Sequence, residues 1–349
     1  MQAFRRRLLG CSLLLSTVPF ATAGEWGRLP PLPDKEGFAG PFAGVSNGVL
    51  VVAGGANFPD KKPWDGGRKV WSDAVFVLKS PDGTWTVAGK LPRPLGYGVS
   101  VTHGSGVVCV GGSDADRHYA DAFRLDWKDG RLGITKLPPL PKPLANGCGA
   151  LVGDTLYVAG GQEKPYSAQA LKAVWRLDLS AKEAKWEKID ECPGDGRMLA
   201  VAASFDGEFW MAGGIDLVAG KGDKVERRYL TDAYRYSPGK GWKQVADLPR
   251  PVAAAPSPAP TDATGFYLLG GDDGSQVGVA PDKHRGFSKQ VLRYDTKTAK
   301  WVEAGEIPVP RVTVPVVAWN KVWVMPSGEV RPGVRSPEVW GFNPDKKKE

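Results

Sequence analysis

Six short apolar segments of this chain end in a pair of small residues, and this repetition limits the folds that are open to it. Five pairs are Gly-Gly, beginning at Gly54, Gly111, Gly160, Gly213 and Gly270, and the sixth is Ser327-Gly328. Successive pairs begin 57, 49, 53, 57 and 57 residues apart. A period of this size is typical of proteins that repeat one supersecondary unit. The sequence therefore predicts six copies of a single structural unit.

Each copy has the pattern of four short strands. An apolar strand leads into the pair, as in VLVVAGG, and a polar loop is followed by a further strand such as DAVFVL. A Trp often opens the fourth strand, and a turn such as LPRP leads into the next copy. This is the kelch pattern, so the chain resembles an all-β, six-bladed kelch β-propeller. Glycine suits the point at which an inner strand turns sharply near a crowded axis.

The two ends of the repeat region complement each other. The sixth copy stops after its third strand at Phe342, whereas EWGRLPPLP near the N-terminus has the pattern of a fourth strand containing Trp26. We therefore expect the N-terminal strand to complete the last blade, which would remove the open edge of the ring. On this interpretation residues 24–349 form a single propeller domain without a linker.

Residues 1–23 have the features of a signal peptide. Arg5-Arg6-Arg7 precede an apolar run, and Ala21-Thr22-Ala23 fits a cleavage site. The run is too short for a membrane anchor, and lipidation at Cys11 is disfavoured because almost no apolar sequence precedes it. We expect a periplasmic or secreted protein that begins at Gly24, and the sequence leaves the Sec and twin-arginine routes open.

Composition narrows the range of partners. The formal net charge of +8 falls to +5 when the three leader arginines are removed with no acid, which is mildly basic and not a nucleic-acid footprint. No other apolar stretch approaches a membrane span. Cys109, Cys148 and Cys192 indicate neither a disulfide framework nor a metal site. With three scattered histidines and no glycine-rich phosphate loop, we expect no metal and no cofactor.

The strand order of a propeller blade predicts where a binding site would lie. Connections between blades and the loops after the glycine pairs emerge at one mouth of the central channel, so their polar side chains should converge there. These residues are Asn57, Arg93, Tyr97, Asn146, Arg197, Arg311, Glu329 and Arg335. Arginines with a carboxylate and aromatic rings suit an anionic polar ligand such as a sugar acid. The alternative for each arginine is a solvated charge at the rim.

Four segments are more specific than the glycine pairs. They are GFAGPFAGVSNGVLVVAGGANFP, LPRPLGYGVSVTHGSGVVCVGG, HRGFSKQVLRYDTKTAKW and GEVRPGVR. Together they resemble the N-acetylneuraminate epimerase (sialic acid mutarotase) family of kelch propellers, and the resemblance covers essentially all of residues 24–349. GEVRPGVR matches the catalytic-loop pattern of that family, a Glu with an Arg six residues later. Its position in the last blade implies a member of the cyclically permuted branch.

The resemblance implies an enzyme that interconverts the anomers of N-acetylneuraminate or a related acidic sugar. Opening the hemiketal and closing it on the other face requires a base for the anomeric proton and a proton for the ring oxygen. Glu329 is the expected base, and Arg335 is expected to fix or polarise the substrate carboxylate through a bidentate pair. The other residues at the mouth are the expected substrate contacts.

Three alternatives stay open at this point. A copper oxidase of the galactose-oxidase type would need His and Tyr ligands at the axis, which His118 and His284 match poorly. A non-catalytic glycan-binding propeller would keep the mouth but tolerate the loss of Glu329. A related epimerase acting on another acidic or amino sugar would share every feature described above. In a purely structural role, Glu329 would form a salt bridge with Arg331 or Arg335 at the rim.

Overall fold

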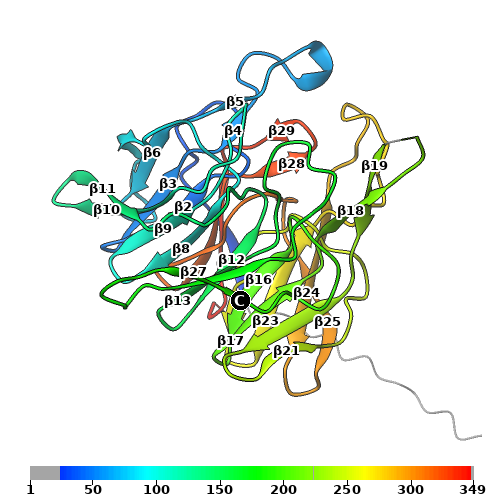
Figure 1. Cartoon of the computed structure of the whole chain (residues 1–349). Coiled ribbons are helices and arrows are strands. Elements are labelled where there is room, and N and C mark those ends of the chain that lie inside the picture. The colour runs from blue at the N-terminus through cyan, green and yellow to red at the C-terminus, as the bar shows by residue number, and fades with distance from the viewer. Residues whose placement is uncertain (1–23, 223, 347–349) are drawn as a thin grey trace, which may run out of the picture.

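Six four-stranded antiparallel sheets surround a central axis in the computed structural model, which describes residues 24–222 and 224–346 (Figure 1). The expected signal peptide lies outside the described residues. The described part of the chain has no α-helix, only the 3-10 turn η1 (Pro63–Asp65). Within it no helix is long and apolar enough to cross a bilayer. The all-β, six-bladed propeller predicted from the repeats is confirmed.

The first three blades follow the order of the chain from the axis outward. Blade 1 consists of β2 (Phe42–Ser46), β3 (Val49–Ala53), β6 (Ala74–Leu78) and β7 (Thr86–Lys90). Blade 2 consists of β8 (Val99–His103), β9 (Gly106–Val110), β10 (Ala122–Lys128) and β11 (Arg131–Leu137). Blade 3 consists of β12 (Cys148–Val152), β13 (Thr155–Ala159), β14 (Val174–Asp178) and β15 (Trp186–Ile189).

The last three blades repeat this arrangement, except at the outer edge of blade 6. Blade 4 consists of β16 (Val201–Phe205), β17 (Glu208–Ala212), β20 (Ala233–Ser237) and β21 (Gly241–Gln244). Blade 5 consists of β22 (Thr261–Asp262), β23 (Gly265–Gly271), β24 (Ser288–Asp295) and β25 (Lys300–Glu306). Blade 6 consists of β26 (Val317–Trp319), β27 (Val322–Pro326), β30 (Val339–Asn343) and β1 (Glu25–Leu29).

The N-terminal strand β1 closes the ring, as the sequence predicts. It pairs antiparallel with β30, from Glu25 opposite Asn343 to Leu29 opposite Val339. The Trp26 ring packs against Phe342 with centroids 5.0 Å apart. The first and last segments of the propeller therefore share one sheet, and blade 6 has no unpaired third strand.

The glycine pairs lie where neighbouring blades touch. Gly54 has φ = +66°, and a Cβ added to it would lie 2.2 Å from the carbonyl oxygen of Leu95 in the connection to blade 2. The next amide, that of Gly55, donates to the same carbonyl at 2.8 Å. A side chain at Gly54 would clash with this carbonyl, so the contact between blades 1 and 2 favours glycine here.

Ser327 replaces the first glycine where the two ends of the chain meet. It keeps the left-handed backbone, with φ = +83°, and its hydroxyl forms hydrogen bonds to two other segments of the chain. Oγ accepts a hydrogen bond from the Phe38 amide at 2.7 Å and lies 2.7 Å from the Ser336 carbonyl oxygen, to which it donates. The departure from Gly-Gly noted in the sequence therefore joins blade 6 to the entry of blade 1.

Three two-stranded hairpins follow glycine pairs and extend from the same end of the propeller, the upper side of Figure 1. They are β4 (Ala56–Asn57) with β5 (Val70–Trp71), β18 (Ile215–Ala219) with β19 (Val225–Tyr229), and β28 (Glu329–Arg331) with β29 (Val334–Arg335). They lie around one mouth of the channel (Figure 1). The sequence predicted post-glycine loops at this mouth but not their pairing into hairpins.

The closure of the ring can be tested by deletion. Removing residues 24–32 eliminates β1 and about five ladder hydrogen bonds, each of which contributes about 1 kcal/mol. We expect the melting temperature to fall by at least about 10 °C. Removing residues 344–349, which lie beyond β30, should change it by much less. Equal melting temperatures for the two truncated proteins would contradict a stabilising role for β1.

Candidate active site

A closed ring of hydrogen bonds surrounds the axis at the mouth bearing the hairpins. One residue from the entry to each blade has a left-handed backbone, with φ between +52° and +64°. Each donates its amide proton to the carbonyl of the preceding member, over distances of 2.6–2.9 Å. The six members are Gly40, Tyr97, Asn146, Leu199, Ala254 and Thr313. The Gly40 amide closes the circle by bonding to the Thr313 carbonyl oxygen at 2.6 Å.

A second ring lies beside the first and contains two carboxyl side chains. Its members are the residues that directly follow the five Gly-Gly pairs and Ser327-Gly328, and each forms a β-bridge with the residue preceding a member of the first ring. They are Ala56, Ser113, Gln162, Ile215, Asp272 and Glu329. Asp272 and Glu329 are the only ionisable members of the second ring, and they lie in adjacent blades. Fold symmetry thus places six equivalent side-chain positions around one opening.

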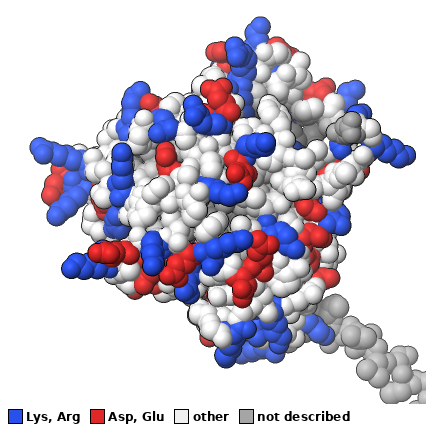
Figure 2. Space-filling view, in the orientation of Figure 1, with Lys and Arg blue, Asp and Glu red and all other residues white. Residues whose placement is uncertain are grey.

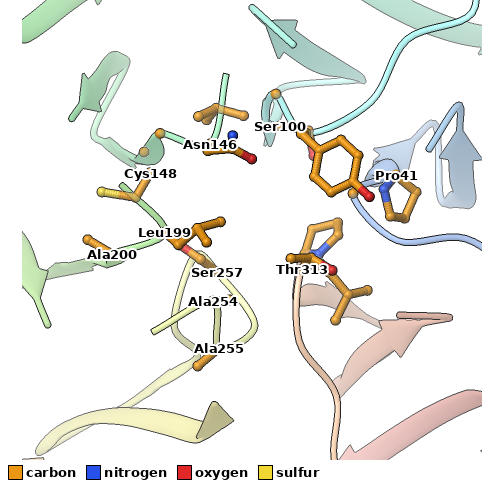
Figure 3. Close-up of a pocket in the computed structure, with 18 residues that line it drawn as sticks. Pro41, Ser100, Asn146, Cys148, Leu199, Ala200, Ala254, Ala255, Ser257 and Thr313 are labelled. Atoms are coloured by element: carbon orange, nitrogen blue, oxygen red, sulfur yellow. The ribbon is translucent and has the colours of Figure 1, made fainter. Parts of the chain in front are cut away.

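Nine of the twelve residues in these rings line a cavity of about 350 Å³ at the mouth. Its polar and charged lining residues are Lys69, Tyr97, Asn146, Gln162, Arg227, Asp272, Thr313, Glu329 and Arg335. Below it the axial channel narrows to a space of about 70 Å³, where Asn146, Leu199, Ala254 and Thr313 lie around the opening (Figure 3). The upper cavity has a volume suited to a small ligand, whereas the channel beneath has room for little more than water.

Glu329 and Arg335 face each other across the β28–β29 hairpin. Arg335 Nη1 lies 3.0 Å from Glu329 Oε1, and the side chains are only 5% and 14% exposed. The Gly333 amide also donates to Glu329 Oε1, at 2.8 Å. The short turn between the two strands explains their six-residue spacing, because it places the carboxylate opposite the guanidinium. The pair predicted from GEVRPGVR therefore forms an ion pair inside the cavity wall.

Arg335 is held from several sides. Its Nε donates to the Ala56 carbonyl oxygen at 3.3 Å, and Nη2 lies 3.5 Å from the Tyr97 hydroxyl. The guanidinium also stacks over the Phe58 ring, 4.7 Å from its centroid. Nη1 has no hydrogen bond of good geometry despite its distance to Glu329. Arg335 is thus largely engaged by the protein, which differs from the expected bidentate contact with a substrate carboxylate.

Two other cations line the cavity with fewer protein partners. Arg227, on β19, is exposed, and Lys69 is half-buried. The Lys69 ammonium lies over the rings of Trp71 and Tyr97, 4.5 Å and 4.2 Å from their centroids. Cation–π contact holds a cation without neutralising it, so the ammonium stays able to pair with an anion. These two cations place positive charge at the cavity wall.

Tyr97 and Asn146 also lie on the cavity wall, as the sequence predicts, and belong to the hydrogen-bonded ring. Asn146 Nδ2 donates to Gln162 Oε1 at 3.1 Å. Asn57 and Arg93 are not among the lining residues. Asn57 is buried and donates to Asp34 at 3.1 Å, whereas Arg93 pairs with Asp121 at 3.4 Å.

Arg197 and Arg311 do not reach the cavity, in contrast to the expectation that they contact substrate. Both side chains are fully buried. Arg197 forms a bidentate pair with Asp232, at 2.9 Å and 2.8 Å, and Arg311 bonds to Glu338 at 3.0 Å. Each acid directly precedes the third strand of a blade. These arginines therefore stabilise the blades, and the proposed site omits them.

Five polar or charged cavity residues were missed by sequence reasoning: Lys69, Gln162, Arg227, Asp272 and Thr313. Asp272 and Gln162 could have been found, because they occupy the same repeat position as Glu329, directly after a glycine pair. Lys69 and Arg227 had no such signal, since they lie on irregular loops and hairpins that differ between the copies. Only the folding of those segments toward the axis brings them to the cavity.

Neither the Cys148 thiol nor the charges on the visible surface (Figure 2) contribute a reactive group to the described site. Cys148 lines the axial channel, and burial raises the pKa of its thiol to about 12, so it stays protonated at neutral pH. Figure 2 shows Lys and Arg side chains interspersed with Asp and Glu over the visible face. On this face positive charge is therefore mixed with negative charge (Figure 2).

The structural role of Arg197 can be tested by substitution. Although burial opposes it, the hydrogen bond and charge of Arg197 hold the pKa of Asp232 below its usual range. Arg197→Met leaves Asp232 partly buried without its partner and should lower the free energy of unfolding by about 3 kcal/mol at neutral pH. The folded-state pKa is depressed, so the ion pair stabilises above about pH 4 and its contribution is lost below.

Urea unfolding at several pH values measures this effect. The stability gap between the parent protein and Arg197→Met should narrow in acid. Arg176→Met is a suitable control, because Arg176 pairs with Glu187 at the surface, where both side chains are at least 40% exposed, and should cost less than about 1 kcal/mol. Equal losses for the two variants would mean that the buried pair has no special structural role.

Comparison with known proteins identifies relatives of this chain. The sequence model of the N-acetylneuraminate epimerase family matches residues 21–134 and 137–279. An N-acetylneuraminate epimerase of Haemophilus influenzae (strain 86-028NP) is 30% identical over 229 residues, which cover 58% of each chain. One from Salmonella typhimurium (strain LT2) is 45% identical over 120 residues, 31% of each chain. The chain thus spans little more than half the length of the Haemophilus relative.

A solved structure shares the fold. The structure described as "Structure of YjhT" superimposes with a TM-score of 0.66 at 16% identity, covering 89% of this chain and 96% of that one. At this identity the likeness shows the propeller architecture alone. The family match ends before Glu329 and Arg335, so the roles of these two residues rest on the cavity geometry. On the matched residues, which make up well over half of its length, this chain belongs to the N-acetylneuraminate epimerase family.

Proposed function

We propose that this protein is a mutarotase that interconverts the anomers of N-acetylneuraminate or of a closely related acidic sugar. The observation that carries the proposal is the ion pair of Glu329 with Arg335, 3.0 Å apart in the wall of a cavity large enough for a monosaccharide. Membership of the N-acetylneuraminate epimerase family supports the same substrate class. The site offers an acid–base group and cations, which is what this reaction requires.

Glu329 acts as the proton acceptor in this mechanism. Its carboxylate takes the proton of the anomeric hydroxyl, the bond from the anomeric carbon to the ring oxygen breaks, and a keto group forms. The protonated Glu329 then gives this proton to the former ring oxygen, which becomes a hydroxyl group. Rotation about the adjacent carbon–carbon bond presents the other face of the ketone, and the hydroxyl attacks it to close the ring as the other anomer. No atom or electron is gained or lost.

Arg335 positions the base, and other cations meet the substrate. Because Arg335 contacts Glu329 and the Ala56 carbonyl oxygen at once, it fixes the carboxylate relative to the second ring. Lys69 and Arg227 are less engaged by the protein and face the same cavity. We assign to them the attraction of the substrate carboxylate, the part first expected of Arg335. Tyr97 and Asn146 offer hydrogen bonds to sugar hydroxyl groups.

The first functional test replaces the base. Glu329→Gln keeps the size of the side chain and an acceptor for the Gly333 amide but cannot take a proton. Exchange between the anomers of N-acetylneuraminate, measured by NMR, should slow by about a hundredfold or more, while the sugar still binds. Arg335→Lys keeps the charge but loses the planar contacts and should also slow exchange.

Glu187→Gln, in the outer strand of blade 3 and remote from the cavity, is the matched control and should exchange at the parental rate. If Glu329→Gln exchanges as fast as the parent, Glu329 has only the structural role of a salt-bridge partner. A parent protein that binds the sugar without accelerating exchange would indicate a glycan-binding propeller.

The second test concerns the charge of the ligand. If Lys69 and Arg227 bind a carboxylate, the affinity for N-acetylneuraminate should fall as ionic strength rises. N-Acetylmannosamine, which lacks the carboxylate, should bind far more weakly. Lys69→Gln should weaken binding of the acid by about tenfold, because a hydrogen bond to a charged group contributes about 1.5 kcal/mol. Lys136→Gln, on the exposed β11, is the control, and equal affinity for both sugars would refute carboxylate recognition.

A further inference from the structure

Asp272 occupies the same place in blade 5 that Glu329 occupies in blade 6. Each directly follows a glycine pair, and each forms a β-bridge to the residue before a member of the hydrogen-bonded ring, Ala253 for Asp272 and Val312 for Glu329. Both carboxyl groups line the same cavity. The symmetry of the propeller therefore presents two carboxyl groups, one blade apart, to a single bound ligand.

Asp272 is fixed in this position by two hydrogen bonds from the protein. The Tyr229 hydroxyl, on β19, donates to Oδ2 at 2.7 Å, and the Gly274 amide donates to Oδ1 at 3.0 Å. Burial, and then the bond to Asp272, raise the pKa of Tyr229, so this hydroxyl keeps its proton and remains a donor. The arrangement holds an acceptor group at the cavity wall.

Neither carboxylate is free to move. Glu329 is held by the Gly333 amide and by Arg335, as Asp272 is held by Gly274 and Tyr229. The two anomers of one sugar, however, direct the reacting hydroxyl differently, because it projects from opposite faces of the ring. A carboxylate held at one side of the substrate is well placed for the hydroxyl of one anomer and poorly placed for that of the other, while the substrate carboxylate stays in place.

We propose that Asp272 is a second catalytic carboxylate, which serves one anomer while Glu329 serves the other. This inference rests on the proposed mutarotase function. One carboxylate accepts the anomeric proton of the first anomer and returns it to the ring oxygen as the carbon–oxygen bond breaks. The other accepts the proton of that hydroxyl as it attacks the opposite face of the ketone, and returns it to the new anomeric oxygen. Each carboxylate ends ionised, so protons balance.

The proposal makes the two carboxylates act in series. Every conversion of one anomer into the other then needs both groups, one for opening and one for closing. Asp272→Asn should therefore slow NMR-measured anomer exchange of N-acetylneuraminate by about a hundredfold, with binding retained. The double variant Asp272→Asn/Glu329→Gln should be little slower than either single variant, because one uncatalysed step already limits the rate.

Tyr229→Phe provides a milder second variant. It keeps Asp272 but removes one of its two donors, and exchange should slow by about tenfold as the carboxylate loses its fixed position. Tyr267→Phe is a matched control, because the Tyr267 hydroxyl makes the same kind of bond to Asp262, at 2.6 Å, at the far end of blade 5. That bond lies about one strand length, or 20 Å, from the mouth, so its loss should not affect exchange.

The possible results separate this inference from the proposed function. Slow exchange for both Asp272→Asn and Glu329→Gln, without additivity, supports it. Parental exchange by Asp272→Asn, with Glu329→Gln slow, overturns the inference and leaves the proposed function intact. If Asp272→Asn does not fold, Tyr229→Phe decides, and a parental rate for it overturns the inference. A parent protein that does not accelerate exchange overturns both.

Discussion

The hydrogen-bonded ring around the axis is the constraint on which the rest of the structure depends. Six amide-to-carbonyl bonds join the blade entries into one circle, and each requires a left-handed backbone at its residue. Such a circle is complete only if the last blade meets the first, as the Gly40–Thr313 bond and the β1–β30 ladder ensure. Because the chain ends are tied together, every member of the ring is bonded to a neighbour on each side, and the mouth forms a closed frame.

A closed frame explains how the site is built from a repeat. The residue after each glycine pair makes the same backbone bridge whatever its side chain is, so Ala56, Ile215 and Glu329 can occupy equivalent positions without altering the fold. The backbone provides stability, and the side chains at this ring are free to provide chemistry. At two of these positions the side chain is a carboxyl group, that of Asp272 or Glu329. The neighbouring hairpins contribute the cations Arg227, on β19, and Arg335, on β29.

Arginine illustrates how identical side chains reach different roles. Arg197 is fully buried against Asp232 and stabilises two blades, whereas Arg335 lies in the cavity wall and contacts the proposed base. Arg227 stays exposed on a hairpin and faces the cavity. In the sequence, all three are arginines near a glycine pair or a blade entry. Their roles differ because Arg197 pairs with a partly buried acid just before a blade strand, whereas Arg335 pairs with an acid in the cavity wall.

The sequence by itself determined the propeller, the number of blades and the closure by Trp26 and its strand, because these follow from a local period and from strand patterns that repeat. It also pointed to Glu329 and Arg335, because the local pattern GEVRPGVR resembles a motif of the family. Only the tertiary structure decided that Arg197 and Arg311 are structural, and that Lys69, Arg227 and Asp272 share the cavity. Those placements depend on contacts between blades and on irregular loops, and no local pattern encodes which distant side chain will meet them.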